Sequence, residues 1–318
     1  MGKNAMNPKD WKGQKNADGY KPTAVPNAFK VIQGQADNDS NKENAEADGK
    51  QTNAYRIPRV VYDGGSVHVS RERHAATVAW FEKYADWKRS GKEFKSDAYI
   101  NTELQWGVWI YCDDRVTLPE AAHSNIRWCF KVRDLKKLHG EMSANGENMT
   151  GLYRGPMGYD YIDVWVSEGV RLTLQGAPDI PNEEWSHDWV RIGVTDIHQA
   201  KAWYSRYIGM SVLSEHPEEG YVVMGMRANF QTGDQEHPFW VLEQLPEGAA
   251  ASSGNDAGVH KDERARPCTF VDKSAFVEYR RFLSEQNLAV SEIEGSLKGL
   301  AKFHLFDPDG NRFNIQTF

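Results

Sequence analysis

One pattern recurs four times along this 318-residue chain: a short alternating strand, a helix with aromatic or apolar anchors, and then more strands. The clearest pair of copies aligns residues 78–84 (VAWFEKY) with residues 201–207 (KAWYSRY). In each copy a tryptophan and a tyrosine lie four positions apart, which places both on one face of a helix. Since each copy of a repeat must pack against its siblings, this pattern predicts helices that cover a sheet.

A second pair of copies completes the repeat. Residues 127–132 (RWCFKV) match residues 266–271 (RPCTFV), and we expect helices to follow at about 134–143 and 273–286. Glycine in a tight turn then opens a terminal strand at Gly169 and at Gly310. The sequence therefore predicts an α+β fold of four βαβββ units in two tandem modules, residues 55–176 and 187–318, joined by a linker at 177–186. A flexible loop is expected at 248–261.

Residues 1–54 differ from the rest in composition. They are rich in Asn, Lys, Asp, Gly and Gln with few apolar positions, and such a segment buries too little surface to offset its ordering entropy. We expect an extended or disordered arm, which could also lie along the body or along a neighbouring subunit.

Charge and hydropathy exclude several classes of protein. The formal net charge of -7 argues against a general nucleic-acid binder, and no apolar run is long enough to predict a membrane span. The three cysteines, Cys112, Cys129 and Cys268, are odd in number and widely spaced, so we expect reduced thiols. The first residues also lack the apolar core of a secretory signal, so the default prediction is a cytoplasmic protein.

Several segments resemble the vicinal-oxygen-chelate superfamily, which includes glyoxalase I, extradiol dioxygenases, fosfomycin-resistance enzymes and bleomycin-resistance proteins. The segments are residues 190–197 (VRIGVTDI), 202–204 (AWY), 208–210 (IGM) and 306–311 (FDPDGN), with a fainter match at 132–135 (VRDL). The resemblance implies glyoxalase-like modules whose curved mixed sheets enclose a cleft. It does not imply a reaction, because one fold hosts many functions.

The resemblance also implies where a divalent metal would be bound. Metal-dependent members use His, Glu or Gln on the first, fourth, fifth and last strands, and the matching residues here are Trp189, Glu243, Arg266 and Asn314 in the second module and Ser66, Cys112, Arg127 and Thr173 in the first. Arginine stays protonated and cannot bind a cation. We therefore expect no metal and no other cofactor. The alternative is a displaced divalent metal held by His187, Glu243 and His304, with His68 in reserve.

Strand alternation predicts what lines the cleft instead. Side chains two residues apart on a strand lie on the same face, so further arginines share the face of the positions that match metal ligands. The expected ligand-binding residues are Trp189, Arg191, Arg266, Cys268, Arg312, Asn314, Arg127 and Arg171. Arginine forks suit carboxylate or phosphate groups, so we expect a small anionic or aromatic ligand. A structural ion pair between Glu243 and Arg266 is the competing interpretation.

Three functional classes remain open. The first is a metal-free small-molecule-binding protein of the glyoxalase and bleomycin-resistance type. The second is a lyase, isomerase or dioxygenase that uses Glu243 as the catalytic residue, and the sequence leaves open whether the protein is an enzyme at all. The third is an assembly module that uses the N-terminal arm. No nucleic-acid or membrane partner is expected, and a homodimer remains open.

Overall fold

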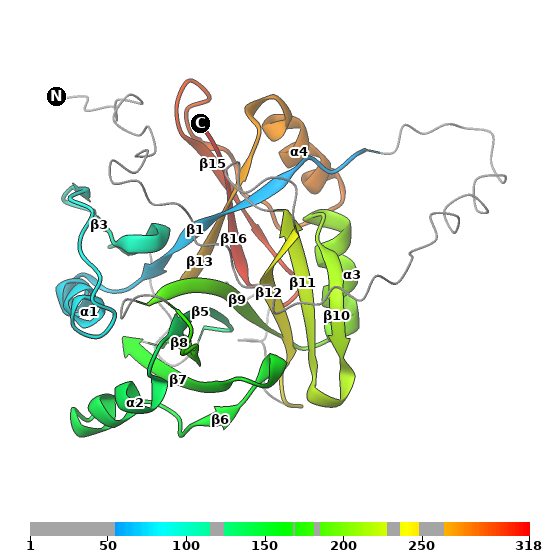
Figure 1. The fold of residues 1–318 in the computed structure, drawn as a ribbon. Coiled ribbons are helices and arrows are strands. Elements are labelled where there is room, and N and C mark those ends of the chain that lie inside the picture. The colour runs from blue at the N-terminus through cyan, green and yellow to red at the C-terminus, as the bar shows by residue number, and fades with distance from the viewer. Residues whose placement is uncertain (1–54, 115–123, 168, 181–184, 228–235, 248–263) are drawn as a thin grey trace. The chain divides into compact units, whose positions relative to one another are not determined.

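Two mixed eight-stranded sheets form the framework of the computed structural model (Figure 1). The structure describes residues 55–114, 124–167, 169–180, 185–227, 236–247 and 264–318. The expected N-terminal arm and the expected loop at 248–261 lie outside these residues, as does part of the expected linker. Residues Ile57–Phe318 form one compact unit.

Each sheet combines strands from both sequence modules. Sheet A has the order β14(Glu294–Gly295), β15(Ala301–Phe306), β16(Arg312–Thr317), β13(Ala265–Val271), β1(Val60–His68), β4(Val108–Asp113), β3(Tyr99–Glu103) and β2(Glu93–Lys95). Sheet B has the order β10(Ser211–His216), β11(Tyr221–Arg227), β12(Glu236–Gln244), β9(Ser186–Val194), β5(Ile126–Val132), β8(Val170–Gly176), β7(Asp160–Ser167) and β6(Tyr153–Arg154). The first copy of the repeat thus pairs with the fourth, and the second pairs with the third.

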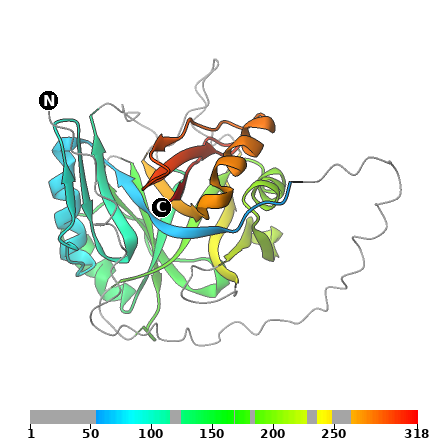
Figure 2. The same cartoon turned by 90° about the horizontal axis from the view of Figure 1, so that it is seen from above.

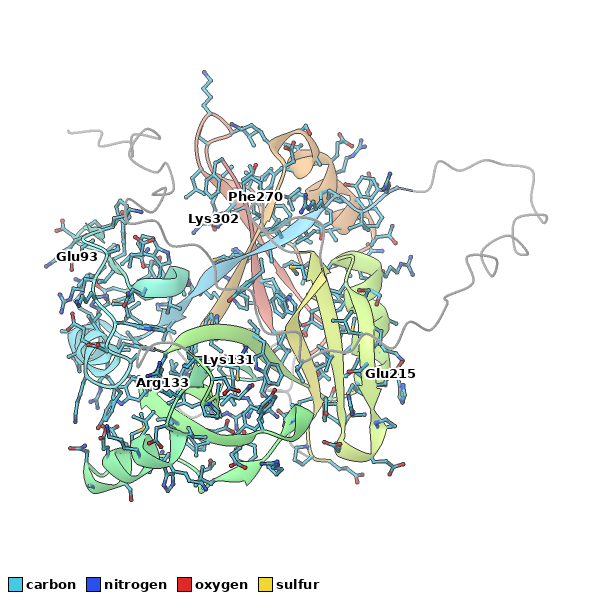
Figure 3. All side chains as sticks on the ribbon, viewed as in Figure 1. Glu93, Lys131, Arg133, Glu215, Phe270 and Lys302 are labelled. Carbon is cyan, nitrogen blue, oxygen red and sulfur yellow. The ribbon has the colours of Figure 1, made fainter. Side chains whose placement is uncertain are left out.

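The central pairings of the two sheets are equivalent. In each sheet the first strands of two copies run antiparallel, β1 against β13 and β5 against β9. Charged side chains lie on strands at the sheet edges, such as Glu93 on β2 and Glu215 on β10 (Figure 3). Charge on an edge strand discourages pairing with another chain.

One helix belongs to each copy of the repeat, and the expected α+β fold of four βαβββ units is confirmed. The helices are α1(Arg71–Tyr84), α2(Leu135–Ala144), α3(Ile197–Tyr207) and α4(Lys273–Glu285), with short 3₁₀ turns at Gln105–Gly107, Pro156–Gly158 and Pro217–Glu219. Helix α1 lies on the other side of the unit from α4 (Figure 2). Among the described residues, no helix is long and apolar enough to cross a membrane.

Aspartate is the N-cap residue of three of the helices. Asp134, Asp196 and Asp272 each accept a hydrogen bond from a backbone N–H of the first turn. Such caps satisfy donors that have no partner inside the helix. The aromatic pairs expected on one helix face also make contact, since the ring centroids of Trp203 and Tyr207 are 5.7 Å apart.

The turn at residues 307–311 connects sheet A to elements of sheet B. The buried Asp307 accepts a hydrogen bond from Tyr204 Oη of α3 at 2.7 Å, and Asn311 Nδ2 donates to the carbonyl of Gly193 on β9 at 3.3 Å. Asp309 accepts from the Thr195 hydroxyl at 2.6 Å, and Gly310 has a φ of 81°. This motif therefore holds the third and fourth copies together.

An aromatic core joins the two sheets. Tyr62 of β1 packs edge-on against Trp240 of β12 with centroids 5.8 Å apart, and Trp128 Nε1 of β5 donates to Tyr62 Oη at 3.0 Å. Gly65 makes room for this packing, because a Cβ there would lie 2.6 Å from the Trp128 ring and 2.8 Å from the Arg266 carbonyl oxygen.

We expect Gly65→Ala to lower the free energy of unfolding by about 1–3 kcal/mol, the usual cost of overpacking. The matched control is Gly140→Ala in α2, where an added Cβ meets nothing within 4 Å. The control should raise stability by up to about 1 kcal/mol, because alanine favours helix over glycine. Denaturant unfolding measures both, and a Gly65→Ala protein as stable as the parent would contradict this account of the core.

Candidate functional site

The two sheets divide the predicted ligand residues into two groups. Sheet B carries Trp189, Arg191, Glu243, Arg127 and Arg171, while sheet A carries Arg266, Cys268, Arg312 and Asn314. The structure therefore does not bring Arg191 together with Arg266 and Arg312. It does bring Arg191 together with Arg127 and Arg171 from the first module.

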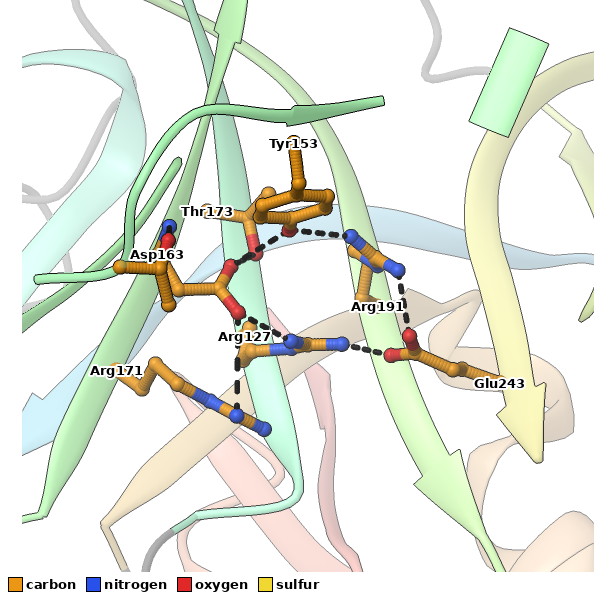
Figure 4. Close-up of polar contacts among 8 residues, drawn as sticks. Arg127, Tyr153, Asp163, Arg171, Thr173, Arg191 and Glu243 are labelled. Carbon is orange, nitrogen blue, oxygen red and sulfur yellow. Dashed lines mark hydrogen bonds and ion pairs between the residues drawn. The ribbon is translucent and has the colours of Figure 1, made fainter. Parts of the chain in front are cut away.

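The predicted faces of the strands agree with the structure. Val190, Ile192, Leu172 and Leu174 are fully buried on the core side of sheet B. We call the opposite side, which carries Arg127, Arg171, Arg191 and Glu243, the inner face of sheet B. Its polar side chains interact with one another (Figure 4).

Three arginines and two carboxylates make up the centre of the inner face. Arg127 Nη1 donates to Asp163 Oδ2 at 2.9 Å, and Arg127 Nη2 donates to Glu243 Oε2. Arg191 Nη2 donates to Glu243 Oε1 at 2.7 Å. Arg171 Nη1 lies 3.9 Å from Asp163 Oδ2, within ion-pair distance. Each carboxylate therefore serves two arginines.

Two hydroxyl groups complete this arginine–carboxylate cluster, which we define as Arg127, Tyr153, Asp163, Arg171, Thr173, Arg191 and Glu243. The Tyr153 hydroxyl accepts from Arg191 Nη1 at 3.1 Å and donates to Asp163 Oδ1 at 3.0 Å. The Thr173 hydroxyl donates to the same Asp163 oxygen at 2.7 Å. Asp163 is thus the acceptor shared by the cluster members of the first module, Arg127, Tyr153, Arg171 and Thr173.

Burial differs across the cluster. The side chains of Arg127 and Arg191 are 5% and 4% exposed, whereas those of Arg171 and Glu243 are 22% and 31% exposed. The Nε atoms of Arg127, Arg171 and Arg191 are buried and have no hydrogen-bond partner among the described residues. The cluster therefore keeps donor capacity that its own acceptors do not fill.

These surroundings shift the pKa values of the cluster. Burial, and next the charge of Arg191, lower the pKa of Arg127 to about 9. Burial raises the pKa of Tyr153 to about 12 and lowers that of Arg171. Burial alone would raise the pKa of Asp163, but Arg127 and Arg171 outweigh it and hold this pKa below its ordinary value. Asp163 therefore remains ionised.

An apolar group lies beside the cluster on the inner face. It contains Cys129, Tyr161, Trp189, Tyr221, Val223 and Val241, with Tyr153 packed against it. The Arg191 guanidinium carbon lies 5.9 Å from the ring centroids of both Tyr161 and Trp189. Trp189 is itself buried and donates from Nε1 to Gln175 at 3.2 Å. The aromatic rings thus pack against one end of the cationic group.

The competing interpretation, an ion pair between Glu243 and Arg266, is wrong. Glu243 binds Arg127 and Arg191, and Arg266 belongs to the other sheet, where its Nη2 donates to His68 Nδ1 at 2.6 Å. The prediction assumed that each module closes its own site. Because the strands pair across modules, the positions that meet on one sheet come from different halves of the chain.

The match between Cys112 and Glu243 is also wrong, by one residue. In the strand register, Arg191 lies opposite Arg127 on sheet B, and Ser66 lies opposite Arg266 at the equivalent position of sheet A. Two residues further along, Gly193 lies beside Glu243, and His68 lies beside Tyr111. Tyr111 is therefore the equivalent of Glu243. A slip of one residue turns a side chain to the other face of a strand, and Cys112 donates there to Asp114 at 3.5 Å.

Sheet A carries its own polar group. Arg312 donates from Nε to Asn314 Oδ1 at 3.1 Å and lies 3.1 Å from His304 Nδ1, while Asn314 Nδ2 donates to Cys268 Sγ at 3.7 Å. The remaining predicted ligand contacts are Arg312, Asn314 and Cys268, together with Arg266. They form a set separate from the arginine–carboxylate cluster.

The residues that the structure describes do not fit the divalent metal that the superfamily implies. Of the positions that match metal ligands, four lie on sheet B: Trp189, Glu243, Arg127 and Thr173. The one carboxylate among them already accepts from two guanidinium groups. Among the described residues, no three His, Cys, Asp or Glu side chains are grouped to hold a metal. Glu243 and His304 lie on different sheets, and the side chain of His187 lies outside the described residues.

Asp163 is the carboxylate of the cluster that sequence reasoning missed. It follows Ile162 and precedes Val164, both fully buried, within the strand Asp160–Ser167. A carboxylate between two core residues is costly unless it is paired. An acidic residue between two apolar ones in the buried part of the strand is the available signal.

We expect Asp163→Asn to lower the free energy of unfolding by about 3–5 kcal/mol at neutral pH, because it leaves buried arginines uncompensated. A depressed carboxyl pKa stabilises the folded state above the ordinary value of 3.8, and this contribution is lost as the pH falls below it. The difference between parent and variant should therefore shrink as the pH falls below 3.8.

Asp160→Asn is the matched control, because Asp160 forms an exposed ion pair with Arg154. The side chain of Asp160 is 45% exposed and that of Arg154 is 70% exposed. The control should cost less than about 1 kcal/mol. Denaturant unfolding at several pH values measures all three proteins, and equal losses for the two variants would contradict the cluster's dependence on Asp163.

Residues 186–315 match the family model described as Glyoxalase/Bleomycin resistance protein/Dioxygenase superfamily. Among solved structures, glyoxalase I from Zea mays aligns at a TM-score of 0.56 and 14% identity, covering 81% of this chain and 92% of the other. A putative dioxygenase from Bacillus subtilis aligns at a TM-score of 0.57 and 8% identity, covering 82% and 86%. No curated protein matches. Such low identities show the fold alone. By the family match, residues 186–315 are similar to the glyoxalase/bleomycin resistance protein/dioxygenase superfamily, and the shared fold is that of two tandem glyoxalase-like modules.

Proposed function

We propose that this protein binds a small anionic or aromatic molecule at the inner face of sheet B and that this site does not use a divalent metal. One observation carries the proposal: three arginines share two carboxylates, which leaves one positive charge in excess among the described residues of the cluster. A buried charge without a counter-ion is unfavourable, so an anionic ligand would complete the charge balance.

Arg171 is the arginine that we assign to the anionic group of the ligand. Its Nε has no hydrogen-bond partner among the described residues, and its nearest carboxylate oxygen is 3.9 Å away. Its side chain is 22% exposed, more than that of Arg127 or Arg191, so a ligand can reach it. The guanidinium carbon lies 5.9 Å from the Trp165 ring centroid, which offers an aromatic contact beside the charge.

Glu243 supports a second candidate function. Its side chain is 31% exposed, so a substrate could reach the carboxylate and use it as an acid–base group. A lyase, isomerase or dioxygenase of this kind would add a metal at His187. Stoichiometric metal in the purified protein that is lost in Glu243→Ala would favour this enzyme over the metal-free binding protein.

The other two proposals use different parts of the chain. Arg266, Cys268, Arg312 and Asn314 on sheet A would form a separate ligand site, and ligand binding that persists in a folded Arg266→Glu protein would remove that residue from it. An assembly role for residues 1–54 would require that their deletion abolish assembly while ligand binding remains.

We expect benzoate to raise the melting temperature of the protein and its neutral analogue benzamide to raise it less, because only benzoate carries the missing negative charge. In Arg171→Gln the affinity for benzoate should fall on the order of tenfold to a hundredfold, the usual value of a charge-assisted hydrogen bond. Thermal shift and isothermal titration measure both effects, with and without added metals.

Arg154→Gln is the control for this experiment. Arg154 lies on β6, pairs only with the exposed Asp160 among the contacts described, and should leave benzoate binding unchanged. Equal stabilisation by benzoate and benzamide, or unchanged benzoate binding in folded Arg171→Gln, would show that an anion is not recognised at Arg171.

A further inference from the structure

Arg127 of β5 lies between two carboxylates on the inner face, and these come from strands on either side of β5. Asp163 lies on β7 and Glu243 on β12, and the two nitrogens at the end of the Arg127 side chain each bind one of them. The Arg127 side chain is 5% exposed, so the cation is buried. Figure 4 shows its guanidinium group between the two carboxylates. The two carboxylates thus form a cation-binding site, and the cation that occupies it is the guanidinium group of Arg127.

The strand order makes this position comparable with a metal centre. Glu243 and Arg127 occupy two of the positions that match metal ligands, and the paired β9 and β5 bring them together on one sheet. Arg127 stands where a ligand would be expected, yet its side chain supplies a positive charge instead of a lone pair. Asp163 then provides a second carboxylate, from a strand that the ligand pattern does not include.

We propose that the Arg127 guanidinium takes the place of a divalent cation between Asp163 and Glu243, so that shortening this side chain uncovers a metal site. Carboxylate oxygens suit Mn²⁺, and an imidazole added to them suits Zn²⁺ or Ni²⁺. The Thr173 hydroxyl, which donates to Asp163 at 2.7 Å, would fix the orientation of that carboxylate. The inference deepens the metal-free part of the proposed function and is independent of the ligand at Arg171.

Neighbouring charges explain why the parent site does not need an exchangeable metal. Arg191 donates to the other Glu243 oxygen at 2.7 Å, so both oxygens of that carboxylate are already bound to arginine. Asp163 accepts from Arg127, Tyr153 and Thr173. A divalent ion could enter only by displacing Arg127, which is tethered to the chain and therefore always present at high local concentration.

Arg127→His and Arg127→Ala test the inference. We expect the parent to bind no more Zn²⁺ or Mn²⁺ than buffer, and Arg127→His to bind about one Zn²⁺ per chain in the micromolar range or tighter. Arg127→Ala should bind Mn²⁺ and should also be stabilised by ethylguanidinium, which restores the missing group. Metal content after dialysis, isothermal titration and melting temperature measure these outcomes.

The controls separate this site from non-specific binding. Arg154→His removes an arginine from an exposed pair with a single carboxylate and should gain no metal. Adding Glu243→Gln or Asp163→Asn to Arg127→His should abolish the gain. Folded Arg127 variants that bind no more metal than Arg154→His, and show no stabilisation by ethylguanidinium, would overturn the inference.

A measurement on the parent decides the matter if the Arg127 variants do not fold. Titration with Mn²⁺, followed by electron paramagnetic resonance, should show no tight site in the intact protein. A tight site that is lost in Glu243→Gln would overturn the inference. The benzoate experiment at Arg171 does not depend on either result, so failure of the ligand proposal and failure of the cation-site inference are distinguishable.

Discussion

The antiparallel pairing of β5 with β9 sets the chemistry of sheet B. Its register places Arg127 directly opposite Arg191 on the inner face. Like charges directly opposite each other on neighbouring strands are destabilising, and here both side chains are buried. The pairing is therefore tolerable only with carboxylates close by, and Glu243 and Asp163 supply them from strands on either side.

The repeat and the strand alternation were sufficient to predict the fold and the faces of the strands. A period of two identifies which side chains share a face, as for Trp189 and Arg191, because that information is local. It does not identify which strands become neighbours. The pairing of the first copy with the fourth joins segments about two hundred residues apart, and nothing in either segment specifies its partner.

The errors at the site have the same origin. Glu243 was matched with Arg266 because both belong to the second module, although the sheets exchange strands between modules. The sequences around Cys112 and Glu243 align, which suggests that the two residues are equivalent. The strand register shows instead that Tyr111 is equivalent to Glu243. Alignment by residue type cannot detect a shift of one residue in a strand, yet such a shift reverses the face.

The segment that carries the family resemblance most clearly is structural. The turn at residues 307–311 binds Tyr204, Thr195 and the Gly193 carbonyl, so it fixes the third copy against the fourth. Resemblance through such a turn reports on the fold, since the turn touches no member of the arginine–carboxylate cluster in the contacts described. The chemistry of the site varies independently of the feature by which the family is recognised.

A buried ionic cluster is weak evidence for stability, because desolvation cancels much of the attraction between its charges. Apolar residues of similar volume would fill the inner face of sheet B at lower cost, and the neighbouring Val223 and Val241 show that this face accepts them. The cluster therefore calls for a reason other than stability. Among the described residues, three arginines are held by two carboxylates, which provides such a reason. The charge left over can be neutralised by a bound anion, whereas a purely structural network would be expected to balance its own charges.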